Sequence, residues 1–292
     1  MGSPCELKVY LPSKKAMEEI TGLVVNEVRR FEEKYTRFKS TSITSQINNS
    51  AGRSQPISVD HETARLLDYA DVLYQQSDGL FDITSGVLRK AWDFKSQQLP
   101  SLAVLKPLLE IIGWSKVIWH DQKVQLPQGG MEIDFGGFVK EYAADVVSSL
   151  CRDQGVVHGL INLGGDVKII GPHPDGSPWA VGIQHPRQPS KPIALVNVWQ
   201  GGIATSGDYE RFMTVNGVRY CHLLNPTTGH SIQPAIASAS VIADTCLIAG
   251  SFSTIAMLKS QNQGDWLDSI GLPYLQVDQN MALSGTVDLT NP

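Results

Sequence analysis

The sequence lacks any concentration of basic residues. No run of Lys or Arg is longer than a pair, and the 292 residues carry a formal net charge of −5 at pH 7. Proteins that bind nucleic acid electrostatically present a basic stripe or patch. We therefore expect no nucleic-acid partner, and an anionic ligand would have to be held by local groups such as backbone N–H groups, a lysine or a bound cation.

Cysteines and long apolar runs are also scarce. The four cysteines (Cys5, Cys151, Cys221 and Cys246) are far apart and form no C-x-x-C pair, so neither a zinc site nor a disulfide framework is expected. Polar residues and glycine interrupt the longest apolar stretch, residues 241–258, which indicates a buried helix rather than a membrane span. No signal-peptide pattern opens the sequence, so we expect a cytoplasmic protein, or a periplasmic one if an export signal has been removed.

Several common site signatures are missing as well. The sequence has no G-x-x-x-x-G-K-[ST], no G-x-G-x-x-G after a strand, no H-E-x-x-H and no G-x-S-x-G. These absences argue against a P-loop, a dinucleotide-binding turn, a zinc protease helix and a nucleophile elbow.

The sequence does have the composition of an ordered globular protein, with 42% hydrophobic and 18% charged residues. Apolar residues recur at steps of three and four over residues 14–38, which predicts a long amphipathic helix. Helices and strands follow without regular alternation, so the α+β class is favoured over a doubly wound sheet, in one domain over residues 1–292. We expect further helices ending at Asp78-Gly79 and covering 100–112, 139–150 and 247–259, and strands in 116–126, 159–171, 179–184, 193–199 and 237–242.

Short turns that combine glycine with a carboxylate or hydroxyl are the remaining candidates for a ligand site. In residues 134–140, a strand ends in two glycines and a helix begins with Lys140, so free N–H groups and an ammonium could receive a pyrophosphate. A plain tight turn with an exposed lysine fits the same residues. Residues 162–166 have the pattern of a hairpin turn. Residues 204–210 could contact a metal or a ribose, or form a solvated loop. His222 fits either a packed core histidine or a general base.

Taken in order, these segments resemble the ApbE family of FAD:protein FMN transferases along nearly the whole chain. The resemblance implies an ApbE-like, T-fold-like mixed sheet with packed helices, in a single compact domain of two lobes. It also implies that the protein binds FAD as a substrate, uses Mg²⁺, and transfers FMN to a Ser or Thr hydroxyl of an acceptor protein with release of AMP. The matching segments are residues 1–4 (MGSP), 81–86 (FDITSG), 134–145 (DFGGFVKEYAAD), 162–166 (NLGGD), 178–187 (PWAVGIQHPR), 204–210 (ATSGDYE) and 222–229 (HLLNPTTG).

The resemblance also implies residue roles. His222 is the candidate general base near the transferred phosphate. Gly137 would offer a backbone carbonyl, and Thr254 its hydroxyl, to the metal. The residues expected to line the FAD site are Met1, Phe38, Leu80, Phe81, Asp82, Asp134, Lys140 and Leu223.

Three positions depart from the family pattern. The family usually has Ala-Asp-x-x-x-Thr in its last motif, with Asp and Thr ligating Mg²⁺, whereas this chain has Gly250 where the Asp stands. Asn225 replaces the usual Asp of H-x-x-D-P, and Glu141 replaces the usual Gly after the motif lysine. We hypothesise that Glu141 supplies the lost charge, and expect Gly250→Asp to raise Mg²⁺ affinity. FAD hydrolysis to FMN and AMP, and FAD binding without catalysis, are the alternative functions.

Overall fold

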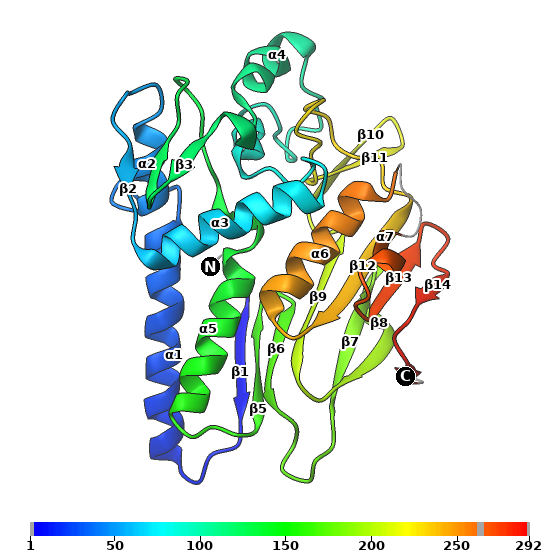
Figure 1. Ribbon diagram of the computed structural model, residues 1–292. Coiled ribbons are helices and arrows are strands. Elements are labelled where there is room, and N and C mark those ends of the chain that lie inside the picture. The colour runs from blue at the N-terminus through cyan, green and yellow to red at the C-terminus, as the bar shows by residue number, and fades with distance from the viewer. Residues whose placement is uncertain (1–2, 262–265, 291–292) are drawn as a thin grey trace. The chain divides into compact units, whose positions relative to one another are not determined.

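The computed structural model describes residues 3–261 and 266–290 (Figure 1). The chain divides into two compact units, each assembled from separate stretches. The first takes in the described residues of Met1–Glu32, Phe138–Tyr209 and Ala235–Pro292, and the second takes in Glu33–Gly137 and Glu210–Pro234. No helix among the described residues is long and apolar enough to cross a membrane.

A seven-stranded sheet forms the centre of the first unit (Figure 1). Every pairing within it is antiparallel, among the residues described. Its strands, in spatial order, are β1 (Cys5–Val9), β5 (Gly159–Leu163), β6 (Asp166–Gly171), β9 (Gly201–Gly207), β12 (Ile236–Ala243), β13 (Tyr274–Asp278) and β14 (Leu283–Gly285).

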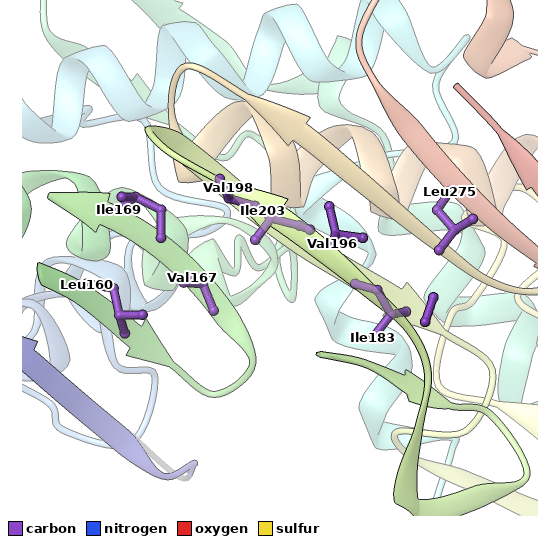
Figure 2. Packing of buried hydrophobic residues seen from close by; sticks show 9 residues of the cluster. Leu160, Val167, Ile169, Ile183, Val196, Val198, Ile203 and Leu275 are labelled. Atoms are coloured by element: carbon purple, nitrogen blue, oxygen red, sulfur yellow. The ribbon is translucent and has the colours of Figure 1, made fainter. Parts of the chain in front are cut away.

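A second, three-stranded sheet packs its apolar side chains against one face of the first. It consists of β7 (Trp179–His185), β8 (Gln188–Val198) and β15 (Leu289–Thr290). Figure 2 shows side chains of β5, β6, β9 and β13 meeting those of β7 and β8 in one cluster. Burying such aliphatic side chains stabilises the fold by roughly 1.5–3 kcal/mol each. The buried members are Leu160, Val167, Ile169, Ile183, Ala194, Val196, Val198, Ile203 and Leu275.

Helix α6 (Cys246–Lys259) covers the other face of the large sheet. Successive side chains of a strand point to opposite faces. On β9, Ile203 joins the cluster against β8, while its neighbour Ala204 packs with Ala243 and with Ala249 of α6. Helix α5 (Val139–Asp153) lies beside α6, and α7 (Trp266–Ser269) follows it.

The long helix α1 (Lys14–Tyr35) forms where the apolar period predicted it, ending three residues before the predicted Phe38. Phe31 of α1 packs edge-on against Tyr142 of α5, with ring centroids 5.5 Å apart. The last turn of α1, from Glu33 onward, belongs to the second unit.

The second unit has its own apolar cluster, which contains Val87, Leu88, Trp92, Leu105, Ile112 and Met213. Its helices are α2 (Ile43–Asn49), α3 (His61–Gln76), η1 (Ile83–Lys90), α4 (Leu102–Ile111), η2 (Trp114–Lys116) and η3 (Phe135–Gly137). Its strands are β2 (Ile57–Ser58), β3 (Ile118–His120), β4 (Lys123–Gln125), β10 (Phe212–Val215) and β11 (Val218–Cys221).

The α+β class is confirmed, and so are the expected helices and strands, with shifts at their ends. Gly79 ends the helical segment as predicted, with φ +80° and its N–H on the carbonyl of Tyr74. The interpretation of residues 204–210 as a solvated loop is wrong for the first four, because Ala204 to Gly207 form part of β9. The single domain over residues 1–292 stays a prediction.

Candidate functional site

The start of α5 carries the lysine expected to receive a phosphate. Lys140 forms an ion pair with Asp166, at the beginning of β6, and its Nζ lies 3.3 Å from Oε1 of Glu141. The turn at Gly164-Gly165 places Asp166 beside α5. The structure thus joins the segments 134–145 and 162–166 through an ion pair that holds the ammonium in place.

Glu141 is the buried neighbour of that lysine. It is 7% exposed, and its Oε2 has no hydrogen-bond partner in residues 3–261 and 266–290. Burial raises the pKa of this carboxyl, and the charge of Lys140 opposes the rise. Glu141 faces Gly250 of α6, where an added Cβ would lie only 2.5 Å from Cγ of Glu141.

Asp145 fixes α5 against the beginning of α6. Its two carboxylate oxygens accept hydrogen bonds from the backbone N–H groups of Cys246 (2.8 Å) and Leu247 (2.9 Å). A carboxylate at a helix N-terminus satisfies free donors and complements the helix dipole. Lys168, buried on β6, lies 3.3 Å from the same carboxylate. These contacts fix the beginning of α6 against α5 and β6.

Thr254, predicted to bind the metal, lies one turn after Gly250 and is half-buried. Its Oγ1 is 2.8 Å from Oγ of Ser206 on β9, which also lies 2.9 Å from Oγ of Ser253. Ser206 therefore connects segment 204–210 to α6.

In the second unit, Asp134 anchors the strand-to-helix turn. Its Oδ2 accepts a 2.6 Å hydrogen bond from Arg37, and its Oδ1 accepts one of 2.8 Å from the N–H of Gly136. Asp134 also packs closely against Gly86, because a Cβ added to Gly86 would lie only 2.7 Å from Cβ of Asp134. Asp134 thus brings segments 81–86 and 134–145 together.

The stretch Leu80-Phe81-Asp82 is held by packing and hydrogen bonds within the second unit. Leu80 is half-buried, and Phe81 is buried against Gly137, where an added Cβ would lie 3.0 Å from the Phe81 ring. The Asp82 carboxylate accepts hydrogen bonds from the N–H and hydroxyl of Thr84 and from the N–H of Trp114. Burial raises the pKa of Asp82, and these hydrogen bonds oppose the rise. Both carboxylate oxygens of Asp82 are thus engaged by donors of the protein itself.

Phe38 differs from its neighbours because its side chain is 81% exposed. The guanidinium of Arg37 lies over its ring, 4.6 Å from the centroid. An exposed aromatic ring fixed by a cation on one side is suited to stacking on a flat ligand.

His222 lies in the segment after β11 and is half-buried. Burial lowers its pKa, and the positive charge of Arg211 lowers it further. No described residue offers a partner to its Nδ1. The imidazole is therefore neutral near pH 7, which is the form that accepts a proton. Leu223, also half-buried, follows it, and its carbonyl accepts the N–H of Ile232.

The segment from residue 222 to 229 closes as a turn around Asn225. The Oδ1 of Asn225 accepts hydrogen bonds from the N–H groups of Thr227 (2.9 Å) and Thr228 (3.1 Å). An Asp would accept the same bonds, so this departure from the pattern leaves the turn intact.

Comparison with known protein families gives a match over most of the chain: the model of the ApbE family matches residues 1–273. The chain belongs to the ApbE family. It is 30% identical over 260 residues to a FAD:protein FMN transferase of Klebsiella pneumoniae (strain 342), covering 87% of this chain and 79% of that protein. A Vibrio cholerae protein of the same name is 26% identical over 216 residues, which cover 72% of this chain and 65% of that protein.

Solved structures of ApbE proteins share the fold. The crystal structure of the ApbE protein from Thermotoga maritima has a TM-score of 0.87 and 29% identity, and the match covers 98% of this chain and 94% of that one. The flavin transferase ApbE of Vibrio cholerae has a TM-score of 0.86 over 99% of this chain and 94% of that one; at 22% identity, it bears on the fold alone.

The residues predicted from the ApbE resemblance are distributed over both units. Lys140 and Thr254 lie in the first unit, and Met1 lies outside the described residues. Those in the second unit are Phe38, Leu80, Phe81, Asp82, Asp134, Gly137, His222 and Leu223. Over the part of the chain that the structure describes, no group of three or more His, Cys, Asp or Glu is arranged to hold a metal.

Sequence reasoning missed the partners that hold these residues. Arg37, Asp166 and Ser206 contact Asp134, Lys140 and Thr254, respectively. Asp166 and Ser206 lie inside segments that match the ApbE pattern, and this match is the sequence feature that could have indicated them. Arg37 falls in none, and only its place beside Phe38 distinguished it.

Proposed function

We propose that this chain transfers the FMN part of FAD to a Ser or Thr hydroxyl of a target protein and releases AMP, assisted by Mg²⁺. The observation that carries this proposal is the ApbE match over residues 1–273. The naming of curated relatives as FAD:protein FMN transferases supports the same reaction.

The reaction breaks the phosphoanhydride bond of FAD and forms a phosphate ester bond to the acceptor. The acceptor hydroxyl oxygen attacks the phosphorus on the flavin side of the pyrophosphate. The bond from that phosphorus to the bridging oxygen breaks, and AMP leaves with the bridging oxygen. His222 takes the hydroxyl proton, which its lowered pKa allows at neutral pH.

Other residues bind and orient the substrate. Phe38 offers an exposed ring for stacking, and Lys140 an ammonium for a phosphate oxygen. Leu80, Phe81, Asp82, Asp134 and Leu223 complete the proposed contacts together with Met1. Gly137 and Thr254 would give oxygen ligands to Mg²⁺, which neutralises charge on the pyrophosphate when bound. The oxygen-rich set around Thr254, with buried Glu141 facing Gly250, fits a hard cation.

The test follows both products. Purified protein is incubated with FAD, Mg²⁺ and a pool of Ser- and Thr-containing peptides, and AMP and peptide mass are measured. AMP together with a mass gain of one FMN group supports transfer. AMP without a mass gain means hydrolysis to FMN and AMP, and no AMP contradicts both reactions. His222→Gln should lower the rate by about 10²–10⁴-fold while FAD still binds.

A further inference from the structure

Helix α6 lacks a side chain at the point where α5 presents a carboxylate. A Cβ on Gly250 would lie 2.5 Å from Cγ of Glu141 and 3.2 Å from both its Cδ and its Oε1. Glu141 therefore occupies the volume that a side chain at position 250 would enter. An Asp at position 250, as in the ApbE pattern, would therefore need the volume that the Glu141 side chain fills.

The Glu141 carboxylate is buried, but one of its two oxygens has no hydrogen-bond donor among the described residues. Glu141 Oε2 is shielded from solvent and accepts no hydrogen bond from any described residue. A buried charged oxygen without a donor is unfavourable unless a cation or proton compensates it. Lys140 is 3.3 Å from the other oxygen, Oε1, and is already paired with Asp166. Oε2 of Glu141 thus stays without a donor among the described residues.

Neutral oxygen ligands are available on the same side of α6. Thr254 follows Gly250 by four residues, so both lie on one face of the helix. Its hydroxyl is held by Ser206 at 2.8 Å. Asp145 binds the first N–H groups of α6 and so fixes the two helices relative to each other. One carboxylate with hydroxyl, water and phosphate oxygens is a typical Mg²⁺ environment.

We propose that Glu141 is the charged ligand of a divalent-cation site between α5 and α6, completed by Thr254 and replacing the carboxylate that Gly250 lacks. The site takes a hard, oxygen-preferring cation, Mg²⁺ or Mn²⁺, of the kind that accompanies a nucleotide pyrophosphate. This inference deepens the proposed function and rests on it for the identity of the substrate.

The structure also changes the expectation for Gly250→Asp. A side chain at 250 would collide with Glu141, and two carboxylates would share one buried volume. The single substitution should therefore fail to strengthen cation binding. The exchange Glu141→Gly with Gly250→Asp moves the carboxylate to α6 without crowding.

The test measures Mn²⁺ binding directly, from the electron paramagnetic resonance signal of free Mn²⁺, with and without FAD. We expect Glu141→Gln and Glu141→Gly each to weaken binding at least tenfold. The double exchange should bind within a few-fold of the wild type, while Asp153→Asn, an exposed change on the same helix, has no effect. Circular dichroism checks that each variant is folded.

The site would be overturned if Glu141→Gln bound Mn²⁺ as tightly as the wild type, or if the double exchange bound no better than Glu141→Gly. A wild type that binds no Mn²⁺ under either condition would overturn it too. AMP release from FAD by the wild type is measured in parallel. Mn²⁺ binding that requires Glu141 without AMP release keeps the site and rejects the transferase. Mg²⁺-dependent AMP release by the wild type, with unchanged Mn²⁺ binding by Glu141→Gln, rejects the site and keeps the proposed FAD chemistry.

Discussion

The side chain of Glu141 fills the space that a side chain at Gly250 would need: a Cβ added to Gly250 would lie 2.5 Å from Cγ of Glu141. Gly250→Ala should therefore destabilise the protein by about 1–3 kcal/mol, the usual cost of overpacking a core. In a Glu141→Gly background, the same change should cost much less or stabilise, since Ala is a better helix former than Gly by about 1 kcal/mol. Urea unfolding of the four proteins measures the coupling.

Gly22 provides the matched control for this cycle. It lies exposed within α1, and a Cβ there would meet nothing within 4 Å in the described chain beyond its own helix and neighbours. Gly22→Ala should raise the free energy of unfolding by up to about 1 kcal/mol. Equal effects at Gly22 and Gly250 would show that Glu141 does not fill the position.

Asp145 should contribute stability through α6 rather than through its own helix. Asp145→Ala removes the acceptor of two N–H groups and the partner of buried Lys168. We expect a loss of about 2–4 kcal/mol in urea unfolding, because two helix N–H groups lose their acceptor and a buried charge keeps fewer acceptors. Asp153→Ala, at an exposed position on α5, should stay within about 0.5 kcal/mol. Similar losses at both positions would reject the capping role.

The local elements were predictable where one period or one turn residue determined them. The apolar spacing predicted α1, and glycine at position 79 predicted the end of the helical segment before it. Strand β9 was harder because Ala204, Thr205 and Ser206 have no strong apolar alternation. It forms because β6 and β12 pair with it on both sides.

The site was predictable only as a set of segments. Family resemblance selected Lys140, but nothing local indicated that Asp166 would pair with it. Similarly, the sequence showed that a carboxylate was gained at Glu141 and lost at Gly250. That the two positions share one volume depends on the packing of α5 against α6, which no spacing along the chain reveals.

Phe38 should contribute to ligand binding without contributing to folding. Its ring is 81% exposed, so Phe38→Ala removes little buried surface and should leave the melting temperature unchanged. If the ring stacks on FAD, the substitution weakens binding by about 1–3 kcal/mol, and Phe38→Trp retains it. Flavin fluorescence titration gives the affinity. Trp199→Ala, another exposed aromatic, should not alter it; unchanged FAD affinity in Phe38→Ala would exclude the stacking role.

His222 gives a prediction in pH. Burial and, second, the charge of Arg211 lower its pKa below the ordinary value of 6.5, so the proton-accepting neutral form persists into weak acid. As pH falls, the rate of AMP release should therefore decline only below about 6.5. Arg211→Gln removes a positive charge, raises the pKa, and should move this decline up by as much as about one pH unit. Arg211→Lys retains the charge and serves as the control. If kcat/KM measured from pH 5 to 8 declines at the same pH in both variants, His222 is not the group that titrates, and the base must be sought elsewhere.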